Sequence, residues 1–233
     1  AHRPHRQPMT HPFLAHYPYR PDSYDELIGD KDVRPHWQAF VDHIEETGTD
    51  TLRARSAQRE RGIQQHGATY NVYADPRGAG RPWSLDLLPL ILPADEWRGI
   101  ATAIAQRARL LDTLLGDLYG PQTTLEKGLL PTELVYGHKG FLWPCQGIRP
   151  AGGHYLHLYA ADLARSPDGR WWVIADRTQA PSGAGYALEN RLIVSRVFAE
   201  QFRDLRVQHL AEFFQHLQDS LARWAPHTSE GGE

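Results

Sequence analysis

The chain has 233 residues, of which 41% are hydrophobic and 10% aromatic, so it can bury a core and is not a disordered tail. Its formal net charge is −3, and its basic residues are scattered among acidic ones, which argues against a nucleic-acid-binding surface. The single cysteine, Cys145, excludes an internal disulfide and a zinc site built from several thiolates.

The sequence also lacks the features of a membrane or secreted protein. No run of residues approaches the ~18 apolar positions that a membrane-spanning helix needs, and residues 1–13 lack the apolar core of a secretory signal. A single cysteine is compatible with a reducing compartment. We therefore expect a cytoplasmic protein with no membrane and no nucleic-acid partner. The chain begins at Ala1 and has its only methionine at Met9, so we expect this start to be processed or cut.

The first predicted elements are an arm followed by helices. Residues 1–21 are rich in His, Pro and Arg and show no periodicity, which predicts an extended arm. Residues 23–26 read Ser-Tyr-Asp-Glu, fit a capping box and predict the start of a first helix. A second helix is predicted from Pro35, with an apolar face that Gly48 ends. The segment after it, residues 51–66, is basic and weakly amphipathic.

The clearest helix is predicted at residues 94–118. Pro93 and the acidic pair Asp95 and Glu96 open it, and its apolar residues recur at spacings of three, four and seven. Alternation, proline and glycine mark the local elements around it. In chain order these are a strand at residues 69–73, a turn at 75–78, an apolar connection at 82–93, a short helix at 122–127 and a loop at 140–153.

A β-hairpin is predicted after this loop. Residues 154–161 and 171–175 read as its strands, and residues 166–169 carry a Ser-Pro-Asp-Gly turn signal. This arrangement would place Asp162 next to Asp176. Two neighbouring carboxylates attract a divalent cation, so both residues are candidate metal ligands.

A glycine-rich segment follows the hairpin. Residues 181–185 read Pro-Ser-Gly-Ala-Gly, and the glycines let backbone N–H groups approach an anion where a helix starts. This helix is predicted at residues 185–198, and another at residues 203–224 carries an apolar stripe that ends at Trp224. Residues 227–233 read as a polar tail. Paired carboxylates and an amide-rich bend together indicate metal–phosphate chemistry.

Residues 162–191 and four upstream stretches carry a resemblance to a known family. The upstream stretches read YDEL at 24–27, GATYNVY at 67–73, RPWSLDLLP at 81–89 and LILPADEW at 90–97. Together they resemble the circularly permuted type 2 ATP-grasp family, relatives of the glutathionylspermidine synthase ATP-grasp domain, over roughly residues 23–215. The resemblance implies an α+β fold, namely an ATP-grasp-like portion with a small, mostly antiparallel sheet and flanking helices.

The resemblance also implies how the chain is organised. We expect an extended arm at residues 1–21, the N-terminal portion of a circularly permuted ATP-grasp domain at 22–198, and an amphipathic helix with a polar tail at 199–233. The lysine-bearing sheet that covers adenine and phosphates in the family is not among the predicted elements. We therefore expect a longer natural protein, in which the remainder of the ATP-grasp domain is the partner of this portion and without which the isolated chain completes no catalytic cycle.

The implied activity is that of an ATP-dependent carboxylate–amine ligase. ATP-grasp enzymes join a carboxylate to an amine through an acyl-phosphate made from ATP, so the resemblance implies ATP and Mg2+ as cofactors and a small-molecule or peptide substrate with a carboxylate and an amine. Asp162 matches the first metal-binding Asp of the family. The Glu-x-Asn of the next strand falls at Ala175 and Arg177, which is a departure. Strand residues two apart share a face, so Asp176 should face the other way unless a bulge turns it.

The expected roles of the candidate site residues take this departure into account. Asp162 would hold Mg2+ weakly, Asp176 is a substitute ligand, and the guanidinium of Arg177 would bind a phosphate bidentately in the catalytic site. The other candidates share an expected contact with ATP, through backbone amides or side chains: Ser182, Gly183, Gly185, Asn190 and Arg191. Two alternatives stay open: the site works in this altered form, or the chain is a non-catalytic scaffold that docks partner subunits through residues 203–224.

Overall fold

The computed structural model describes residues 11–15, 17–18, 20, 22–30, 32–67, 69–70 and 81–225. Helices predominate in this part of the chain, and its strands pair in two small sheets, which confirms the predicted α+β class. The expected turn at residues 75–78, the polar tail and the first ten residues of the arm lie outside the described residues. No helix in the described part combines the length and apolar character that a bilayer crossing requires.

The chain folds into two compact units, and each is described by itself. Unit 1 comprises the described residues of Ala1–Ala94, Arg165–Trp171 and Ser182–Leu210. Unit 2 comprises the described residues of Asp95–Ala164, Trp172–Pro181 and Ala211–Glu233. The tip of the predicted hairpin and most of the glycine-rich segment therefore belong to unit 1, whereas most of the two hairpin strands belongs to unit 2.

Unit 1 is built from helices and one short strand pair. Its elements are η1 (Pro12–Leu14), α1 (Pro35–His66), β1 (Thr69–Tyr70), β2 (Arg81–Pro82), α5 (Ala184–Val197) and α6 (Ala199–Asp204). Strands β1 and β2 are antiparallel, with Thr69 opposite Pro82 and Tyr70 opposite Arg81. This pairing confirms the start of the strand predicted at residue 69.

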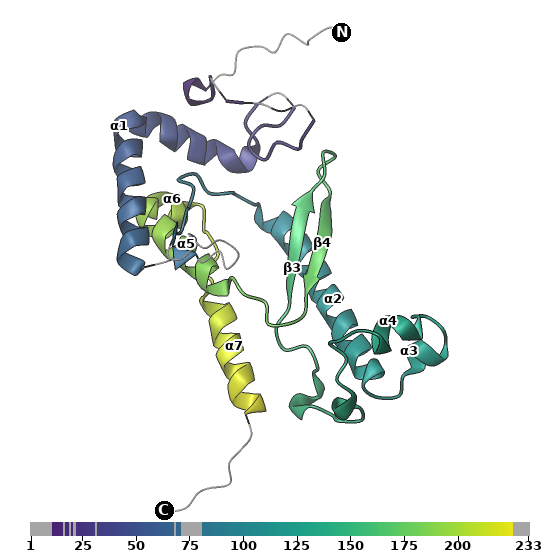
Figure 1. Cartoon of the computed structure of the whole chain (residues 1–233). Helices are drawn as coiled ribbons and strands as arrows, with labels where there is room; N and C mark the ends of the chain where they lie inside the picture. Colours follow the sequence, from purple (N-terminus) through teal and green to yellow (C-terminus); the bar gives the residue numbers. More distant parts are fainter. Residues whose placement is uncertain are drawn as a thin grey trace, which may run out of the picture. The chain divides into compact units, whose positions relative to one another are not determined.

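Helix α1 begins at Pro35 and is interrupted at Gly48, as the sequence predicts. Proline suits the first helical position because its fixed φ is helical and its missing N–H has no intrahelical role there. Gly48 has φ 76° and ψ 167°, a conformation that glycine adopts without a side-chain clash. Figure 1 shows the result, two stretches of α1 that run in different directions. The second stretch ends at Gly67, which is left-handed and donates its N–H to the carbonyl of Gln64.

The hydrophobic core of unit 1 joins α1 to α5, which lies beside the second stretch of α1 (Figure 1). Aromatic contacts hold its centre, since the ring centroids of Phe40 and Phe198 are 5.2 Å apart and those of Trp37 and Phe40 are 5.9 Å apart. The buried members come from the N-terminal segment, α1 and the α5–α6 region: Leu14, Leu27, Ile28, Val33, Trp37, Phe40, Val41, Ile44, Ile63, Ile193, Val197 and Phe198.

The prediction of a helix start at residues 23–26 is wrong. Asp25 Oδ1 instead accepts hydrogen bonds from the backbone N–H groups of Leu27, at 3.0 Å, and Ile28, at 2.8 Å. Such local side-chain bonds offer the backbone an alternative to helical pairing. The chain then turns back through a bridge between Ile28 and Val33.

Part of the expected arm is also folded. Leu14 is only 1% exposed and belongs to the core, where η1 packs against α1. His11 Nδ1 and Glu45 Oε2 of α1 form a hydrogen bond at 3.0 Å, and Phe13 donates its backbone N–H to Glu45 Oε1. A sequence without periodicity can therefore still dock, through one apolar side chain and two polar contacts.

Unit 2 contains the long helix and the hairpin. Its elements are α2 (Ala94–Leu118), α3 (Thr123–Glu126), α4 (Thr132–Tyr136), η2 (Trp143–Cys145), η3 (Ala151–Gly153), β3 (Ala160–Arg165), β4 (Trp171–Arg177) and α7 (Ala211–Trp224). Helix α2 has the predicted bounds, and β3 and β4 form the predicted hairpin (Figure 1). Of the hydrophobic residues described in unit 2, only Ile100 is buried, with 9% of its surface exposed.

The first hairpin strand lies later than predicted, beginning at Ala160 and not at His154. The carboxylate of Asp112 in α2 binds the segment before it. Oδ1 accepts the backbone N–H groups of Tyr155, at 2.7 Å, and Leu156, at 2.9 Å, while Oδ2 lies 2.8 Å from the Nδ1 atom of His154. Backbone groups bound to a helix carboxylate cannot join a sheet ladder, so the strand starts only beyond them.

The C-terminal helix is shorter than predicted, because the range 203–224 divides in two. Arg206 has a left-handed φ of 51°, which an L-residue cannot continue into a helix, and α7 begins only at Ala211. None of the residues of α7 is buried. The predicted apolar stripe is therefore present but lies at the surface of unit 2.

Candidate functional site

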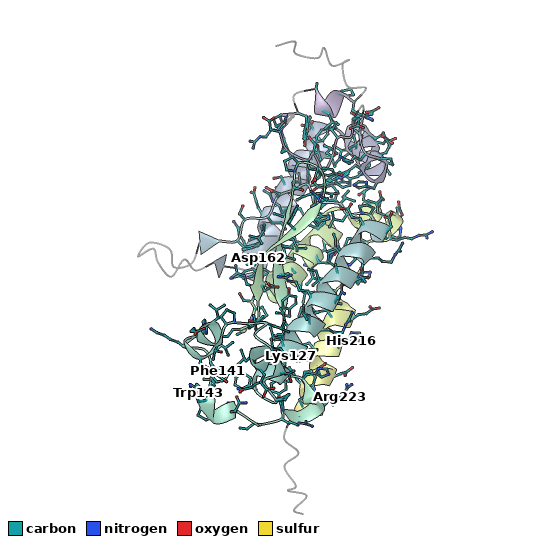
Figure 2. The ribbon with its side chains drawn as sticks, turned by 90° about the vertical axis from the view of Figure 1, so that its right-hand side faces the viewer. Lys127, Phe141, Trp143, Asp162, His216 and Arg223 are labelled. Carbon is teal, nitrogen blue, oxygen red and sulfur yellow. The ribbon has the colours of Figure 1, made fainter. Side chains whose placement is uncertain are left out.

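Asp162 and Arg177 form an ion pair across the hairpin, with Asp162 on β3 (Figure 2). Arg177 Nη2 donates to Asp162 Oδ2 at 2.6 Å, and Arg177 Nε lies 3.1 Å from the same oxygen and 3.2 Å from Oδ1. Hydrogen bonds from Arg177 lower the pKa of Asp162, and the same bonds raise the pKa of Arg177. The carboxylate is thus ionised and already has a cationic partner.

Asp176 has a different set of partners. Arg107 of α2 binds it bidentately, with Nε to Oδ1 and Nη2 to Oδ2 both at 2.6 Å, and the hydroxyl of Tyr159 donates to Oδ1 at 2.5 Å. Hydrogen bonds from Arg107, and then from Tyr159, hold the pKa of Asp176 at about 2. Burial and the hydrogen bond to Asp176 raise the pKa of Tyr159. This network joins the hairpin to α2.

The hairpin does not bring its two carboxylates into one cluster. Successive strand residues point to opposite faces, so Arg177 meets Asp162 while Asp176 meets Arg107. Among the described residues, no group of three or more His, Cys, Asp or Glu side chains could hold a metal ion. The donor set therefore fits Mg2+ only if phosphate oxygens and water complete the coordination around Asp162.

The hairpin tip is anchored within unit 1 by an arginine that the sequence reading did not single out. The guanidinium of Arg165 lies 3.8 Å from the ring centroid of Tyr24 and 4.9 Å from that of Trp171, and its Nη1 is 3.0 Å from Glu26 Oε2. A Cβ at Gly169 would lie 2.7 Å from the Tyr24 ring. The YDEL stretch therefore positions the tip of the hairpin.

The glycine-rich segment ends as the N-terminus of α5. Gly183 is the residue before the helix, with φ 115°, and no side chain caps the helix. Ser182 is exposed, and its side chain makes no capping hydrogen bond to the helix. A Cβ at Gly183 or Gly185 would meet nothing within 4 Å. The segment thus leaves helix N–H groups without a side-chain partner, a feature that suits an anion.

Three consecutive polar residues of α5 have distinct environments. Glu189 forms a short hydrogen bond with His66, whose other ring nitrogen lies 3.0 Å from Arg196 Nη1. Asn190 Oδ1 accepts a hydrogen bond at 2.7 Å from the indole of Trp83. Arg191 is half-buried, and burial lowers its pKa.

Arg191 has no carboxylate partner among the described residues, and its guanidinium carbon lies 6.0 Å from the Phe202 ring centroid. A partly desolvated cation without an acid beside it favours binding of an anion. Burial anchors the helix, since Ile193 is 2% and Val197 6% exposed. Residues three and seven apart share a helix face, so Asn190 lies on the anchored side of α5 and Arg191 on the side away from it.

The structure reveals functional-site neighbours that the sequence reading missed. They are the partners of the predicted residues: Arg107, Tyr159 and Trp83. Each lies between 17 and 107 residues from its partner, so no local spacing could have connected them. Of these partners, only Trp83 lies in a stretch that the sequence analysis singled out, the RPWSLDLLP stretch at residues 81–89. The predicted residues of unit 2 are Asp162, Asp176 and Arg177, and those of unit 1 are Ser182, Gly183, Gly185, Asn190 and Arg191.

Comparison with known proteins relates the chain to one family. A family model described as circularly permuted ATP-grasp type 2 matches residues 89–233. An uncharacterized protein of Mycobacterium tuberculosis is 38% identical over 217 residues, covering 89% of this chain and 24% of that protein. An uncharacterized protein of Synechocystis is 32% identical over 204 residues, covering 87% of this chain and 42% of that protein.

A Frankia alni protein provisionally named glutamate–cysteine ligase 2-3 is 33% identical over 211 residues. This match covers 89% of the chain and 24% of that protein. The chain therefore spans less than half of the length of each of these relatives.

Proposed function

The chain belongs to the circularly permuted ATP-grasp type 2 family, and we propose that it is part of an ATP-dependent carboxylate–amine ligase that carries the metal hairpin and the phosphate-binding glycine segment. A relative named as a glutamate–cysteine ligase supports this class of reaction. The proposed substrates are a small molecule or peptide with a carboxylate and a second molecule with an amine. The remainder of the longer protein would supply the other part of the domain.

The observation that supports the proposal is the pairing of Asp162 with Arg177, at two positions that the family pattern assigns to metal ligands. Both side chains are substantially exposed, so a ligand can reach them. A polyphosphate would replace the carboxylate of Asp162 as the partner of the Arg177 guanidinium, because phosphate oxygens offer the same bidentate geometry as a carboxylate. Asp162 would then be free to turn towards a cation.

Magnesium would be held by Asp162 together with phosphate oxygens and water, whereas Asp176, on the other face and bound to Arg107, would not share it, and the ion would neutralise phosphate charge when bound. The backbone N–H groups at Ser182, Gly183 and Gly185 would bind phosphate oxygens at the start of α5. Asn190 and Arg191, in the second turn of that helix, would add a donor and a positive charge. Binding and orienting the transferred phosphate is the contribution that these residues would make to the reaction.

The test is calorimetric titration of the longest available form of the protein with ATP, once with excess Mg2+ and once with EDTA. Wild-type protein should bind in both cases, and more tightly with Mg2+. Asp162→Ala should lose the gain that Mg2+ gives and keep ATP binding in EDTA, because Arg177 then has no competing carboxylate. Arg177→Ala should weaken binding in both conditions. Ligand at 100 times its Kd should also stabilise the wild-type fold by ~2.7 kcal/mol.

Asp219→Ala is the matched control, because Asp219 is an exposed aspartate of α7 outside the proposed site. It should bind ATP as the wild type does. Absence of ATP binding by the wild-type protein, or equal Mg2+ dependence in Asp162→Ala and in the wild type, would contradict the proposal.

A second candidate function is that of a non-catalytic scaffold. The observation that favours it is the surface position of α7, where Phe213 is 46% and Leu221 59% exposed. An apolar helix face of this kind suits docking of another protein segment. Under this alternative, the isolated protein would show no change in melting temperature with Mg2+ and ATP, and Asp162→Ala would not alter its interactions.

A further inference from the structure

One contact in unit 1 determines what Asn190 can do chemically. The Nε1 atom of Trp83 donates a hydrogen bond to Asn190 Oδ1 at 2.7 Å. An indole nitrogen can only donate, so the atom that it meets must be the amide oxygen and not the amide nitrogen. The bond therefore fixes the orientation of the amide as well as its position.

The same indole is itself held in place. The ring of Trp83 stacks on Tyr186, one turn earlier in α5, with centroids 4.4 Å apart and planes inclined by 23°. Trp83 also packs against the hydrophobic core of unit 1. Because the ring cannot rotate freely, its N–H direction is set before any ligand binds.

The amide nitrogen of Asn190 has no hydrogen-bond partner among the described residues. Asn190 is half-buried, so an N–H donor without an acceptor there lowers the stability of the fold unless water or a ligand accepts its hydrogen bond. The next residue, Arg191, is half-buried and lacks a carboxylate partner in the same part of the chain. Two consecutive residues of α5 therefore offer an N–H donor and a positive charge.

We infer that Trp83 is a positioning residue that turns the side-chain NH2 of Asn190 into a donor for an anionic oxygen and makes Oδ1 a poorer metal ligand. The inference rests on the proposed function, in which the anion is the polyphosphate of ATP. An asparagine that binds a cation must use its oxygen, and here the indole N–H already takes one of the two lone pairs of that oxygen and fixes its direction. Asn190 thus belongs to the phosphate side of the site.

The experiment uses the full chain and calorimetric titration with ATP in EDTA, with ATP and Mg2+, and with inorganic tripolyphosphate. Asn190→Asp replaces the donor with a charged acceptor and should raise the Kd for ATP and for tripolyphosphate about tenfold or more. Trp83→Phe keeps an aromatic ring on Tyr186 but removes the N–H, and should raise both Kd values by about three- to tenfold. Trp97→Phe, at a tryptophan of α2 that is 43% exposed, is the matched control and should change neither.

A spectroscopic readout separates positioning from general stability. In a 15N NMR spectrum, the Trp83 indole N–H should exchange slowly with water and shift in Asn190→Leu. Addition of tripolyphosphate should move the side-chain NH2 signals of Asn190 in the wild-type protein and not in Trp83→Phe. A merely structural role for Trp83 would leave that NH2 response intact.

Several outcomes would overturn the inference. If Asn190→Asp binds ATP and Mg2+ as tightly as the wild type, or more tightly, Asn190 is a cation ligand. If the Trp83 indole N–H is unchanged in Asn190→Leu, the bond that fixes the amide does not exist. If the wild-type protein binds neither ATP nor tripolyphosphate, both the proposed function and the donor role of Asn190 are wrong. If the wild-type protein binds them and the Asn190 and Trp83 variants bind equally well, only the donor role is wrong.

Discussion

Ile193 is the residue through which the fold of unit 1 should control the position of the α5 side chains. It is 2% exposed and lies over Gly62 of α1, where a Cβ on the glycine would be 3.4 Å from Ile193 Cγ1 and 3.6 Å from Cγ2. The absence of a side chain at Gly62 therefore lets the isoleucine lie against the helix backbone. Asn190 and Arg191 project from the same helix, so loss of this contact should loosen them.

The cost of Ile193→Ala follows from what it removes. Three buried carbons at about 0.8 kcal/mol each give roughly 2.4 kcal/mol. The backbone of α1 beneath them cannot move into the space, so a cavity term adds to this loss and the total should be about 3–4 kcal/mol. For a chain of this size that corresponds to a fall in melting temperature of roughly 6–16 °C.

The assay is urea unfolding followed by far-UV circular dichroism, with hydrogen exchange of the α5 peptide as the local probe. Leu192→Ala is the matched control, because Leu192 is the neighbouring residue of the same helix and is 37% exposed. It should cost about 1 kcal/mol or less. If Ile193→Ala costs no more than Leu192→Ala, α5 is not anchored by the core of unit 1 and the reasoning fails.

Two further predictions concern unit 2. Arg107 depresses the folded-state pKa of Asp176 from its ordinary 3.8 to about 2, so the stability that this pair adds is present above pH 4 and lost as the pH falls to about 2. Urea unfolding of Asp176→Asn should therefore depend less on pH in that window than unfolding of the wild type. A Cβ at Gly152 would lie 2.4 Å from Trp224 Nε1, whereas Gly153 has the same left-handed φ and open space around it. Gly152→Ala should therefore lower the melting temperature more than Gly153→Ala, and equal effects would refute the clash.

The elements that the sequence predicts correctly are those set by local chemistry. The bounds of α2 follow from a proline, an acidic first turn and a regular apolar spacing, all of which act within a few residues. The break at Gly48 follows from the conformational freedom of glycine in an otherwise helical pattern. These signals need no knowledge of what the helix packs against.

The elements that it misplaces are those where a carboxylate binds backbone N–H groups that the sequence assigns to other structure. The strand expected from His154 is displaced because Asp112, 42 residues earlier, captures the local backbone. The capping box at residues 23–26 fails because the carboxylate of Asp25 accepts hydrogen bonds from the backbone amides of Leu27 and Ile28. In both cases the carboxylate could accept hydrogen bonds from more than one set of partners, and the sequence does not show which set it binds in the fold.

In the candidate site, too, local patterns predict some features and contacts between separate elements determine the others. The hairpin signal alone would place Asp176 next to Asp162, whereas strand periodicity combined with the family pattern predicts that Arg177 shares a face with Asp162 and that Asp176 does not, and the ion pairs agree with this alternation. Periodicity could not supply Arg107 or Trp83, because each reaches its partner from another element. The residues that orient a site are thus harder to predict than the residues that would touch the ligand.

The distribution of charge explains how a site that departs from the Glu-x-Asn pattern could still bind ATP under the proposed function. Each hairpin carboxylate already has an arginine, so neither adds uncompensated negative charge that would repel a polyphosphate. Within unit 1, taken by itself, Arg191 of α5 has no acid beside it among the described residues, and Asn190 keeps a free N–H donor. Affinity for phosphate would then come mainly from protein cations and N–H groups, with less dependence on the metal than in a site that has two carboxylates and an asparagine oxygen. The replacement of an asparagine by Arg177 is consistent with that balance, since it exchanges a metal ligand for a phosphate ligand at the same place on the strand.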